Sequence, residues 1–255
     1  MSRRLWLPRR HIAEKLGVDR RDFLAFGAFG SAALIATALG GCDWKGPPGS
    51  GRVLRAADRW NERVERALYR HRAMNTAPAG ARAAGADFPG YFISPEVPVW
   101  DEAARGTWRL EVGGLVARPL RLTLDELIAL PRTELRLEHF CVEGWSAVAV
   151  RAGVRVSDLA RKAGLSPDAR YVDFQSFDDG YHESWDLDSA LHPQTLIVYG
   201  QDGKLLSPEF GAPTRVYSPV KLGYKSTKYL TSVVFLAERN GGYWSDQGYE
   251  WYAGT

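Results

Sequence analysis

Short strand-like segments separated by turn residues recur through most of the chain after residue 106, and this pattern constrains the fold more than any other feature. Each segment alternates apolar and polar residues or is rich in β-branched and aromatic ones, and each is bounded by glycine, proline or aspartate. We expect strands over residues 107–113, 134–142, 171–177, 195–200, 204–207, 211–217 and 229–236.

Few helices interrupt these strands, and those that do are short. Thr123 and Glu126 are spaced as a capping box, which predicts a helix that ends before Pro131. Ser157 can cap another helix that Gly164 closes. No repeat of 20 to 50 residues and no second block of composition occurs in the 255 residues. These patterns predict a single α+β domain.

The first 42 residues have the composition of an export segment. Basic residues precede the pair Arg20-Arg21, an uncharged run follows from Phe23 to Gly41, and Leu39-Gly-Gly-Cys42 ends it. The segment resembles a twin-arginine signal followed by a lipoprotein processing box, which implies a periplasmic protein tethered to the inner membrane through Cys42. Alternatives are cleavage near Gly41 with Cys42 incidental, and a permanent anchor, for which the run is barely long enough.

Residues 43–86 separate this segment from the domain, which we place at 87–255. Apolar residues from Val53 to Leu68 recur near a helical period, with Arg and Glu between them. This predicts an amphipathic helix over 52–70 whose apolar face packs on the core. Residues 71–90 are rich in Ala, Gly and Pro and are expected to form an irregular connection.

The charge balance excludes one class of partner. Residues 1–42 hold seven of the 33 basic and three of the 30 acidic residues, so the rest of the chain is close to neutral. The folded domain therefore has no overall excess of positive charge with which to bind nucleic acid.

Cys141 is the one cysteine that follows Cys42 in the sequence, so the domain cannot contain an internal disulfide. A solitary cysteine is usually a small buried hydrophobic residue, but it can also be a metal ligand or a reactive thiol. His139 stands two residues before it and would share its face of a strand, which leaves a cysteine hydrolase as an alternative.

The residues around Cys141 and five later motifs point to one family. The motifs are Cys141-Val-Glu-Gly-Trp145 with Gly153-Val154, then Tyr171–Ser176, Asp179-Gly-Tyr181, Gly211-Ala-Pro-Thr-Arg215, Gly223–Lys228 and Gly242–Tyr249. In this order they resemble the sulfite oxidase-like, molybdopterin-dependent oxidoreductases. The resemblance implies a sulfite oxidase-like molybdopterin-binding domain of short strands with few short helices, and the cofactor molybdenum-molybdopterin (Mo-MPT).

The resemblance also assigns roles to individual residues. It implies that the Cys141 thiolate binds molybdenum, a soft ligand for a metal that changes oxidation state. It places the cofactor phosphate at Lys225, Ser226, Thr227 and Lys228, whose ammonium groups, hydroxyls and backbone N–H groups suit an anion.

Three more residues match cofactor-contacting positions of the family. Arg215 follows Gly-Ala-Pro, and its planar fork of donors suits phosphate or a pterin oxygen, although a surface salt bridge is the alternative. Ser176 matches a hydroxyl position but ends a predicted strand, where serine is often a turn residue. Tyr91 lies near a pterin-contacting segment and is equally suited to the core.

Two residues depart from the family pattern. Phe210 stands where His or Asn is usual, and Arg151 stands where many relatives carry Trp. Arg151 either points into the substrate pocket, where its charge would favour an anionic substrate, or points outward at a turn. We expect the second.

Within the family, the resemblance is nearer to bacterial catalytic subunits that reduce sulfoxides with electrons from a membrane cytochrome b. It implies reduction of an S- or N-oxide, either a small molecule or protein-bound. One alternative is oxidation of sulfite, although the sulfite oxidases of the family place additional arginines near the active cysteine. The other is a non-catalytic lipoprotein that keeps the fold as a binding module. No haem motif Cys-x-x-Cys-His and no Gly-x-Gly-x-x-Gly fingerprint occurs in the sequence.

Overall fold

A computed structural model describes residues 50–69, 74–81, 84 and 88–255. The chain divides into two compact units, Met1–Ala57 and Asp58–Thr255. The described part of the first unit is the start of helix α2 (Ser50–Leu68), and both sheets belong to the second unit. The export segment predicted over residues 1–42 lies outside the described residues. Among the described helices, none is both long and apolar enough to cross a membrane.

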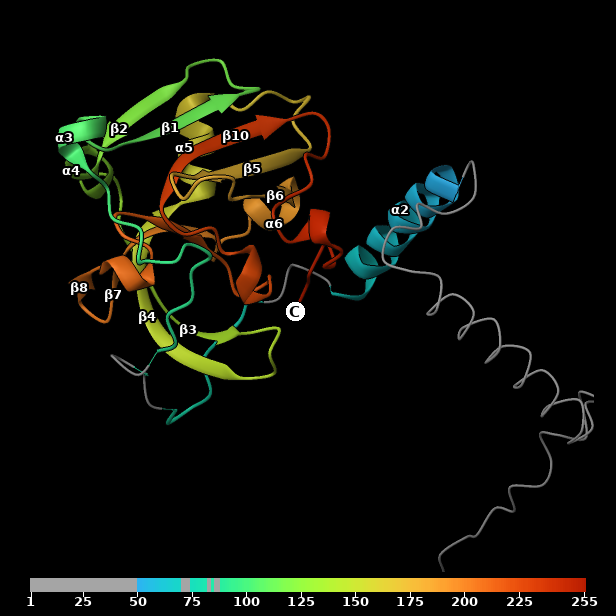
Figure 1. The fold of residues 1–255 in the computed structure, drawn as a ribbon, viewed down its shortest axis with the longest axis horizontal. Helices are drawn as coiled ribbons and strands as arrows, with labels where there is room; N and C mark the ends of the chain where they lie inside the picture. Colours follow the sequence, from blue (N-terminus) through green and yellow to red (C-terminus); the bar gives the residue numbers. More distant parts are fainter. Residues whose placement is uncertain (1–49, 70–73, 82–83, 85–87) are drawn as a thin grey trace, which may run out of the picture. The chain divides into compact units, whose positions relative to one another are not determined.

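The first sheet has the strand order β2-β1-β10-β5-β6 (Figure 1). Its strands are β1 (Arg109–Gly114), β2 (Leu120–Thr123), β5 (Tyr171–Ser176), β6 (His182–Asp186) and β10 (Leu230–Leu236). Strands β1 and β10 run parallel, with Glu111 opposite Ser232, and the other neighbours are antiparallel. The parallel pair brings the last long strand of the chain into the middle of the sheet, beside the first.

The second sheet is antiparallel throughout. It is built from β3 (Thr133–Phe140), β4 (Ser146–Arg155), β7 (Leu196–Gln201), β8 (Lys204–Leu205) and β9 (Arg215–Tyr217). Strand β4 lies between β3 and β7, while β8 and β9 pair with different parts of β7. All six residues of β7 are buried, as expected for a central strand.

The helices are short and lie between strands. They are α3 (Glu102–Arg105), α4 (Leu124–Ile128), α5 (Val156–Ala163) and α6 (Leu187–Ala190), with 3₁₀ turns η3 (Pro208–Phe210), η4 (Gly223–Lys225) and η5 (Ser245–Gln247). The α+β fold of short strands and few short helices is thereby confirmed. The capping box of Thr123 and Glu126 forms as predicted, and Gly164 ends α5 with a φ of 72°. The predicted cap at Ser157 is wrong, because Arg155 occupies the N-cap of α5 without a side-chain hydrogen bond.

The main core forms between the two sheets. Val112 and Phe174 of the first sheet and Val154 and Ile197 of the second belong to one buried apolar cluster, with Leu159 of α5. Removing these side chains from water is the main favourable contribution to folding. The strands β2, β4 and β6 were not predicted from the sequence, and β4 matters most because it crosses the middle of the second sheet.

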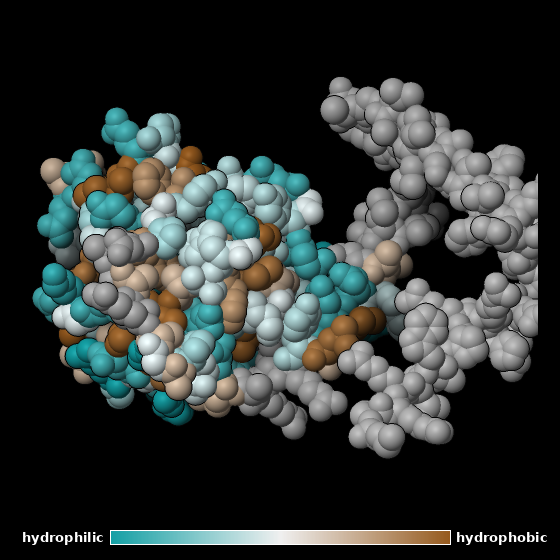
Figure 2. All heavy atoms as spheres, turned by 90° about the horizontal axis from the view of Figure 1, so that it is seen from below, coloured by the Kyte–Doolittle hydropathy of each residue, from teal (hydrophilic) through white to brown (hydrophobic). Residues whose placement is uncertain are grey.

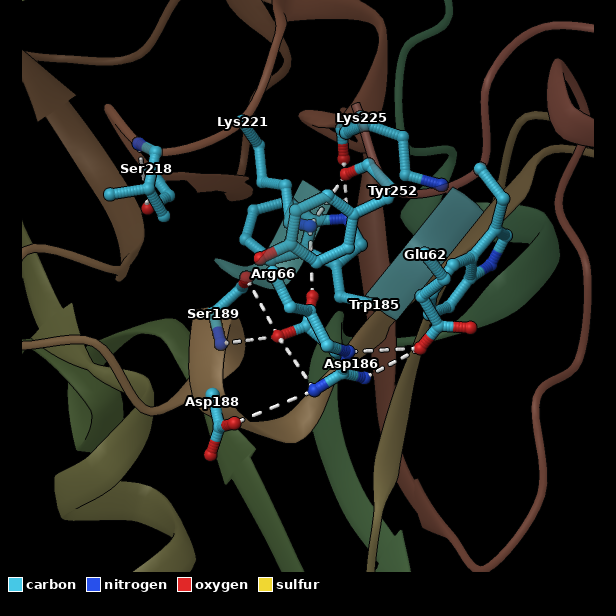
Figure 3. A network of polar contacts seen from close by, with 12 residues as sticks. Glu62, Arg66, Trp185, Asp186, Asp188, Ser189, Ser218, Lys221, Lys225 and Tyr252 are labelled. Carbon is cyan, nitrogen blue, oxygen red and sulfur yellow. Dashed lines mark hydrogen bonds and ion pairs between the residues drawn. The ribbon is translucent and has the colours of Figure 1, made fainter. Parts of the chain in front are cut away.

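Helix α2 contacts the domain through its polar side (Figure 3). Arg66 lies 2.7 Å from Glu62 on the helix and 3.8 Å from Asp186, the last residue of β6. Asp186 is fully buried, and Lys221 donates to it at 2.8 Å. Burial on its own raises the pKa of Asp186, but Lys221 and Arg66 outweigh burial and hold that pKa well below its usual range.

The prediction that the apolar face of this helix packs on the core is wrong. Trp60 and Leu68 are 66% and 71% exposed, whereas Glu62 is 8% exposed. The helix itself is confirmed, but the buried ion pairs determine which of its sides faces the domain.

We expect Asp186→Asn to lower the free energy of unfolding by about 3 kcal/mol, because it leaves Lys221 buried without a counter-charge. The folded-state pKa of Asp186 lies below the unfolded value of about 3.9. Ionised Asp186 therefore contributes its full share to the free energy of unfolding above the unfolded-state pKa, and this share is lost as the pH falls through the folded-state pKa. Urea unfolding at pH 7 measures the difference between variant and wild type. Asp188→Asn is the control, since Asp188 also approaches Arg66 but has an 82% exposed side chain; equal losses in both variants would contradict the prediction.

Candidate active site

A pocket opens where the carboxyl end of β3 meets η4, the residues that follow it and the segment around η5. Six of the eight residues predicted for the site line it: Tyr91, Cys141, Ser176, Arg215, Ser226 and Lys228. They come from parts of the sequence up to 137 residues apart, and the fold brings them together. The other two, Lys225 and Thr227, do not line the pocket.

Cys141 is the first residue after β3, in the turn that leads to β4. Its backbone N–H donates to the Trp145 carbonyl at 3.0 Å, and its carbonyl accepts from Gly144 at 3.1 Å, so the turn fixes the position of the sulfur. The thiol lies 3.8 Å from the carboxylate of Glu143, to which Trp145 also donates at 2.9 Å. Burial, with the nearby Glu143 carboxylate, raises the pKa of the thiol. A bound cation would have the opposite effect and favour the thiolate.

Two cations stand at the inner side of the pocket. Arg215 is 4% exposed and donates to the carbonyls of Phe210 and Ser226, each at 3.2 Å. Lys228 donates to the carbonyls of Tyr91 and Glu209 at 2.5 and 2.6 Å. Burial, together with the positive charges of Arg215 and Arg151, lowers the pKa of Lys228 to about 6. The site is electropositive and disfavours adding a proton.

Arg151 adds a third positive charge behind the pocket. It lies in β4 and is 0% exposed, with its guanidinium carbon 4.7 Å from the centre of the Phe88 ring and 5.0 Å from that of Tyr217. One nitrogen bonds Gln201, while Nε and Nη2 have no partner among the described residues. The expectation that Arg151 points outward at a turn is wrong, because Arg151 lies in strand β4, which the sequence pattern did not indicate.

Several buried donors beside the pocket are left without a partner in the described part of the chain. They are Nε of Arg215, Oγ of Ser226 and Oγ1 of Thr227. None of the three cations Arg151, Arg215 and Lys228 forms an ion pair with a described carboxylate. Unpaired buried charges and donors are costly, and an anion that accepts from them would remove that cost.

Lys225 serves a different purpose from the predicted one. Its ammonium is fully buried and pairs with the carboxylate of Glu183 in β6. Glu183 also accepts from the backbone N–H of Trp244 at 2.9 Å, and a side chain at Gly242 would collide with it. This pair ties the turn that precedes Ser226 to the segment that carries Trp244, so Lys225 is a structural support and not part of the pocket surface.

The remaining positions singled out from the sequence lie in or beside the pocket. The Ser176 hydroxyl accepts from Asp178 N–H at 2.9 Å at the end of β5, a turn contact, while its side chain lines the pocket. Tyr91 is 60% exposed, with its ring 6.3 Å from Trp244. Phe210 does not line the pocket and packs its ring 6.0 Å from Phe88. Gly211 has a φ of 100°, and a Cβ there would lie 2.8 Å from the side chain of Lys228.

His139 also lines the pocket, although the family resemblance gave it no role. Its position two residues before Cys141 on a strand was the sequence feature that could have indicated this. Burial, together with the charge of Arg215, lowers its pKa to about 3, so the ring is neutral. In the described structure the thiol of Cys141 bonds Glu143 and not His139. The arrangement therefore gives no support to the cysteine hydrolase alternative.

Aromatic side chains form the mouth of the pocket and were not predicted as site residues. Tyr224 and Trp244 each pack against Tyr249, with ring centres 5.4 and 5.0 Å apart. These three and Tyr91 line the pocket. Individually, aromatic residues near a C-terminus are indistinguishable from core residues in a sequence.

Comparison with known proteins identifies this arrangement. Residues 95–244 match the family described as the oxidoreductase molybdopterin binding domain. The chain belongs to this family. Its members are oxidoreductases, so the molybdopterin-binding fold and the enzyme class predicted from Cys141 and the later motifs are confirmed.

Curated relatives of this chain include an uncharacterized oxidoreductase and proteins named as methionine-sulfoxide reductase subunits. The YedZ1 subunit of Azospira oryzae, provisionally named a protein-methionine-sulfoxide reductase subunit, is 43% identical over 66% of this chain and 63% of its own. The uncharacterized oxidoreductase YuiH of Bacillus subtilis is 36% identical over 60% of this chain and 77% of its own.

The catalytic subunit MsrP of Ralstonia nicotianae is 33% identical over 54% of this chain and 46% of its own. The chain thus matches about half of that relative and less than two thirds of the first. A solved structure, the sulfane dehydrogenase SoxCD of Paracoccus pantotrophus, aligns with a TM-score of 0.49 at 21% identity over 52% of this chain and 39% of that chain.

We expect Arg151→Met to raise the free energy of unfolding of the cofactor-free protein by about 1 kcal/mol, because it removes a buried charge that lacks a counter-charge. It also removes one cause of the depressed pKa of Lys228, which we expect to rise above 6. Urea unfolding measures the first effect and pH titration of Lys228 by NMR the second. The control is Arg136→Met on the exposed side of β3, expected to change stability by less than about 0.5 kcal/mol. A clearly less stable Arg151 variant would contradict the prediction.

Proposed function

We propose that this protein is an exported molybdenum enzyme that reduces an S- or N-oxide by oxygen-atom transfer, with electrons supplied by a membrane cytochrome of the b type. The proposed substrate class includes methionine sulfoxide, free or in proteins. The names of the YedZ1 and MsrP relatives support a sulfoxide, and the remainder of the proposal rests on the site and on the sequence before it.

One observation carries the proposal: the pocket combines an accessible thiol with a buried surplus of cations and unpartnered donors. Arg215, Ser226 and Lys228 offer donors to a phosphate, and Cys141 offers a soft thiolate to a metal in the same pocket. These residues fit Mo-MPT, which ends in a phosphate and binds metal through sulfur. Among the described residues, no group of three or more His, Cys, Asp or Glu side chains could hold a metal ion. Cys141 is the candidate protein ligand because its sulfur is a soft donor in the wall of the pocket.

When bound, Mo-MPT supplies a metal that exchanges an oxygen atom with substrate while changing oxidation state by two electrons. The protein's own residues position that chemistry. Cys141 would hold the metal, Arg215 and Lys228 with the Ser226 and Thr227 hydroxyls would hold the phosphate, and the aromatic mouth would exclude water from the substrate. Reduction of a sulfoxide also consumes two protons, which must enter from solvent past this mouth.

The location and electron donor are proposed from the N-terminal sequence. Paired arginines, an uncharged run and Cys42 favour export and a lipid tether. We propose that a separate protein delivers the electrons, and a tethered enzyme would meet a membrane cytochrome readily. The competing function is a binding module without catalysis. The molybdenum content of protein purified from molybdenum-replete cells distinguishes the proposed enzyme from such a binding module.

We expect Cys141→Ser to abolish sulfoxide reduction, because a serine hydroxyl is a harder and far less acidic ligand than a thiol. The fold should persist, since the backbone bonds of Cys141 to Trp145 and Gly144 do not need sulfur. Reductase assays with methionine sulfoxide and trimethylamine N-oxide, together with circular dichroism, measure both effects. Full activity of the variant would exclude Cys141 as the metal ligand, and a chain that never contains molybdenum would exclude the proposed function.

Two neighbouring lysines are expected to differ. Lys228→Ala should lower molybdenum and pterin occupancy at least about tenfold and leave the free energy of unfolding within about 1 kcal/mol, because Lys228 bonds carbonyls and no carboxylate. Lys225→Ala should cost about 3 kcal/mol, because it leaves Glu183 buried and unpaired.

Metal analysis and urea unfolding of each variant separate the two roles, with the exposed Lys204→Ala as the control for both. Normal occupancy in Lys228→Ala would remove that residue from the phosphate site. An unchanged stability of Lys225→Ala would show that the pair with Glu183 is not a support.

A further inference from the structure

Helix α2 presents an apolar stripe to solvent. Trp60, Val64 and Leu68 follow one another at intervals of four residues and therefore lie along one side of the helix. They are 66%, 37% and 71% exposed, and Ala67 beside them is exposed as well. On the face shown in Figure 2, hydrophobic and hydrophilic side chains are mixed over the described surface.

The helix cannot readily turn to bury this stripe against its own domain. The opposite side is held by Glu62 and Arg66, which pair with each other, and Arg66 also pairs with Asp186 (Figure 3). Arg239 lies 3.7 Å from the carboxylate of Glu62. Asn61 also donates to Glu250 at 3.1 Å. Turning the helix would leave Asp186 and Glu62 without part of their counter-charge, which is costly for buried groups. The stripe is thus locked outward.

The border of the stripe is basic. Arg59 and Arg63 are exposed and follow each other on the side of the helix next to Trp60. The acidic residues Glu62 and Glu65 lie toward the domain, where Glu62 is buried and Glu65 half-buried. An apolar stripe with tryptophan and leucine, bordered by arginine, is the pattern of a helix that lies in the interface of a lipid bilayer.

We infer that helix α2 lies on a membrane surface, with Trp60, Val64 and Leu68 in the lipid interface and Arg59 and Arg63 against anionic headgroups. The chain before the helix supports this choice of occupant. The uncharged run Phe23–Gly41 and Cys42 precede the helix, which begins eight residues after Cys42. Eight residues span at most about 28 Å, so a tether in the membrane holds the helix near its surface.

A second copy of the chain fits the stripe less well. A stable dimer buries roughly 800 Å² on each partner, and three large apolar side chains on one helix supply a small part of that area. The arginines that border the stripe would also face each other in a symmetric pair. A bilayer with anionic lipids can contact both the apolar side chains of the stripe and the arginines beside it, and it needs no complementary protein surface.

The test uses the full chain and vesicles of phosphatidylethanolamine and phosphatidylglycerol. Replacing Trp60, Val64 and Leu68 together by Ser is expected to lower the vesicle partition coefficient at least about tenfold. The control is Val99→Ser with Leu205→Ser, since these residues are similarly exposed at 66% and 60% but lie outside the helix. Because the N-terminal segment is the same in every variant, this ratio isolates the contribution of the helix.

A second readout locates the helix. Brominated lipid in the vesicles is expected to quench part of the tryptophan fluorescence, and Trp60→Phe is expected to remove the Trp60 part. Arg59→Gln with Arg63→Gln should weaken binding to vesicles containing phosphatidylglycerol and leave binding to phosphatidylcholine vesicles unchanged.

Three outcomes would overturn the inference: equal partitioning of the serine variant and its control, quenching that Trp60→Phe does not alter, or a dimer in sedimentation that the serine variant loses. The inference does not depend on the reaction. Sulfoxide reduction in detergent is expected to be equal in the serine variant and the wild type, so either proposal can fail without the other.

Discussion

The buried pair of Glu183 and Lys225 is the interaction on which the site most depends. Lys225 ends the 3₁₀ turn η4, directly before the hydroxyls of Ser226 and Thr227, and Glu183 lies in β6 of the first sheet. Since Glu183 also accepts from the N–H of Trp244, one carboxylate holds both the basic turn and the aromatic segment in place. Burying this charge pair costs desolvation energy, but removing either partner costs more because the other charge would stay buried and unpaired. The pair therefore fixes the basic turn and the aromatic segment relative to each other.

That fixed geometry keeps like charges close to each other. Arg215 and Lys228 stand in the same pocket with Arg151 behind them, and burial together with the charge of Arg151 lowers the pKa of Arg215 to about 9. Lys225 and Lys221 are paired with carboxylates, whereas these three cations have no carboxylate partner in the part of the chain that the structure describes. The first two are therefore structural, and the other three are available to a ligand. A bound anion would offset the cost of these unpaired charges, since a ligand specific for the folded state stabilises that state.

The sequence predicted the fold class and most of the pocket because those features are local. Alternation, the Thr123 cap and Gly164 are each visible within a few residues, and the family motifs place Cys141, Arg215 and Lys228. The features that the sequence did not indicate depend on contacts between residues far apart in the chain. Lys225 looks like Lys228 until Glu183, 42 residues earlier in the chain, is placed beside it, and the apolar side of α2 was assigned to the core because Asp186 could not be seen to hold the opposite side.

The distribution of charge and aromatic rings within the pocket bears on the choice between sulfoxide and sulfite. The cations lie on the inner side, with Arg215 held by the carbonyl of Ser226, where they suit the cofactor phosphate. The mouth carries Tyr224, Trp244 and Tyr249, and His139 is neutral. A doubly charged sulfite would leave water for a mostly aromatic mouth with Glu143 beside the thiol, which is unfavourable. A neutral S-oxide has an apolar body for the rings and one acceptor oxygen, so the same surface supports the proposed reduction of a sulfoxide.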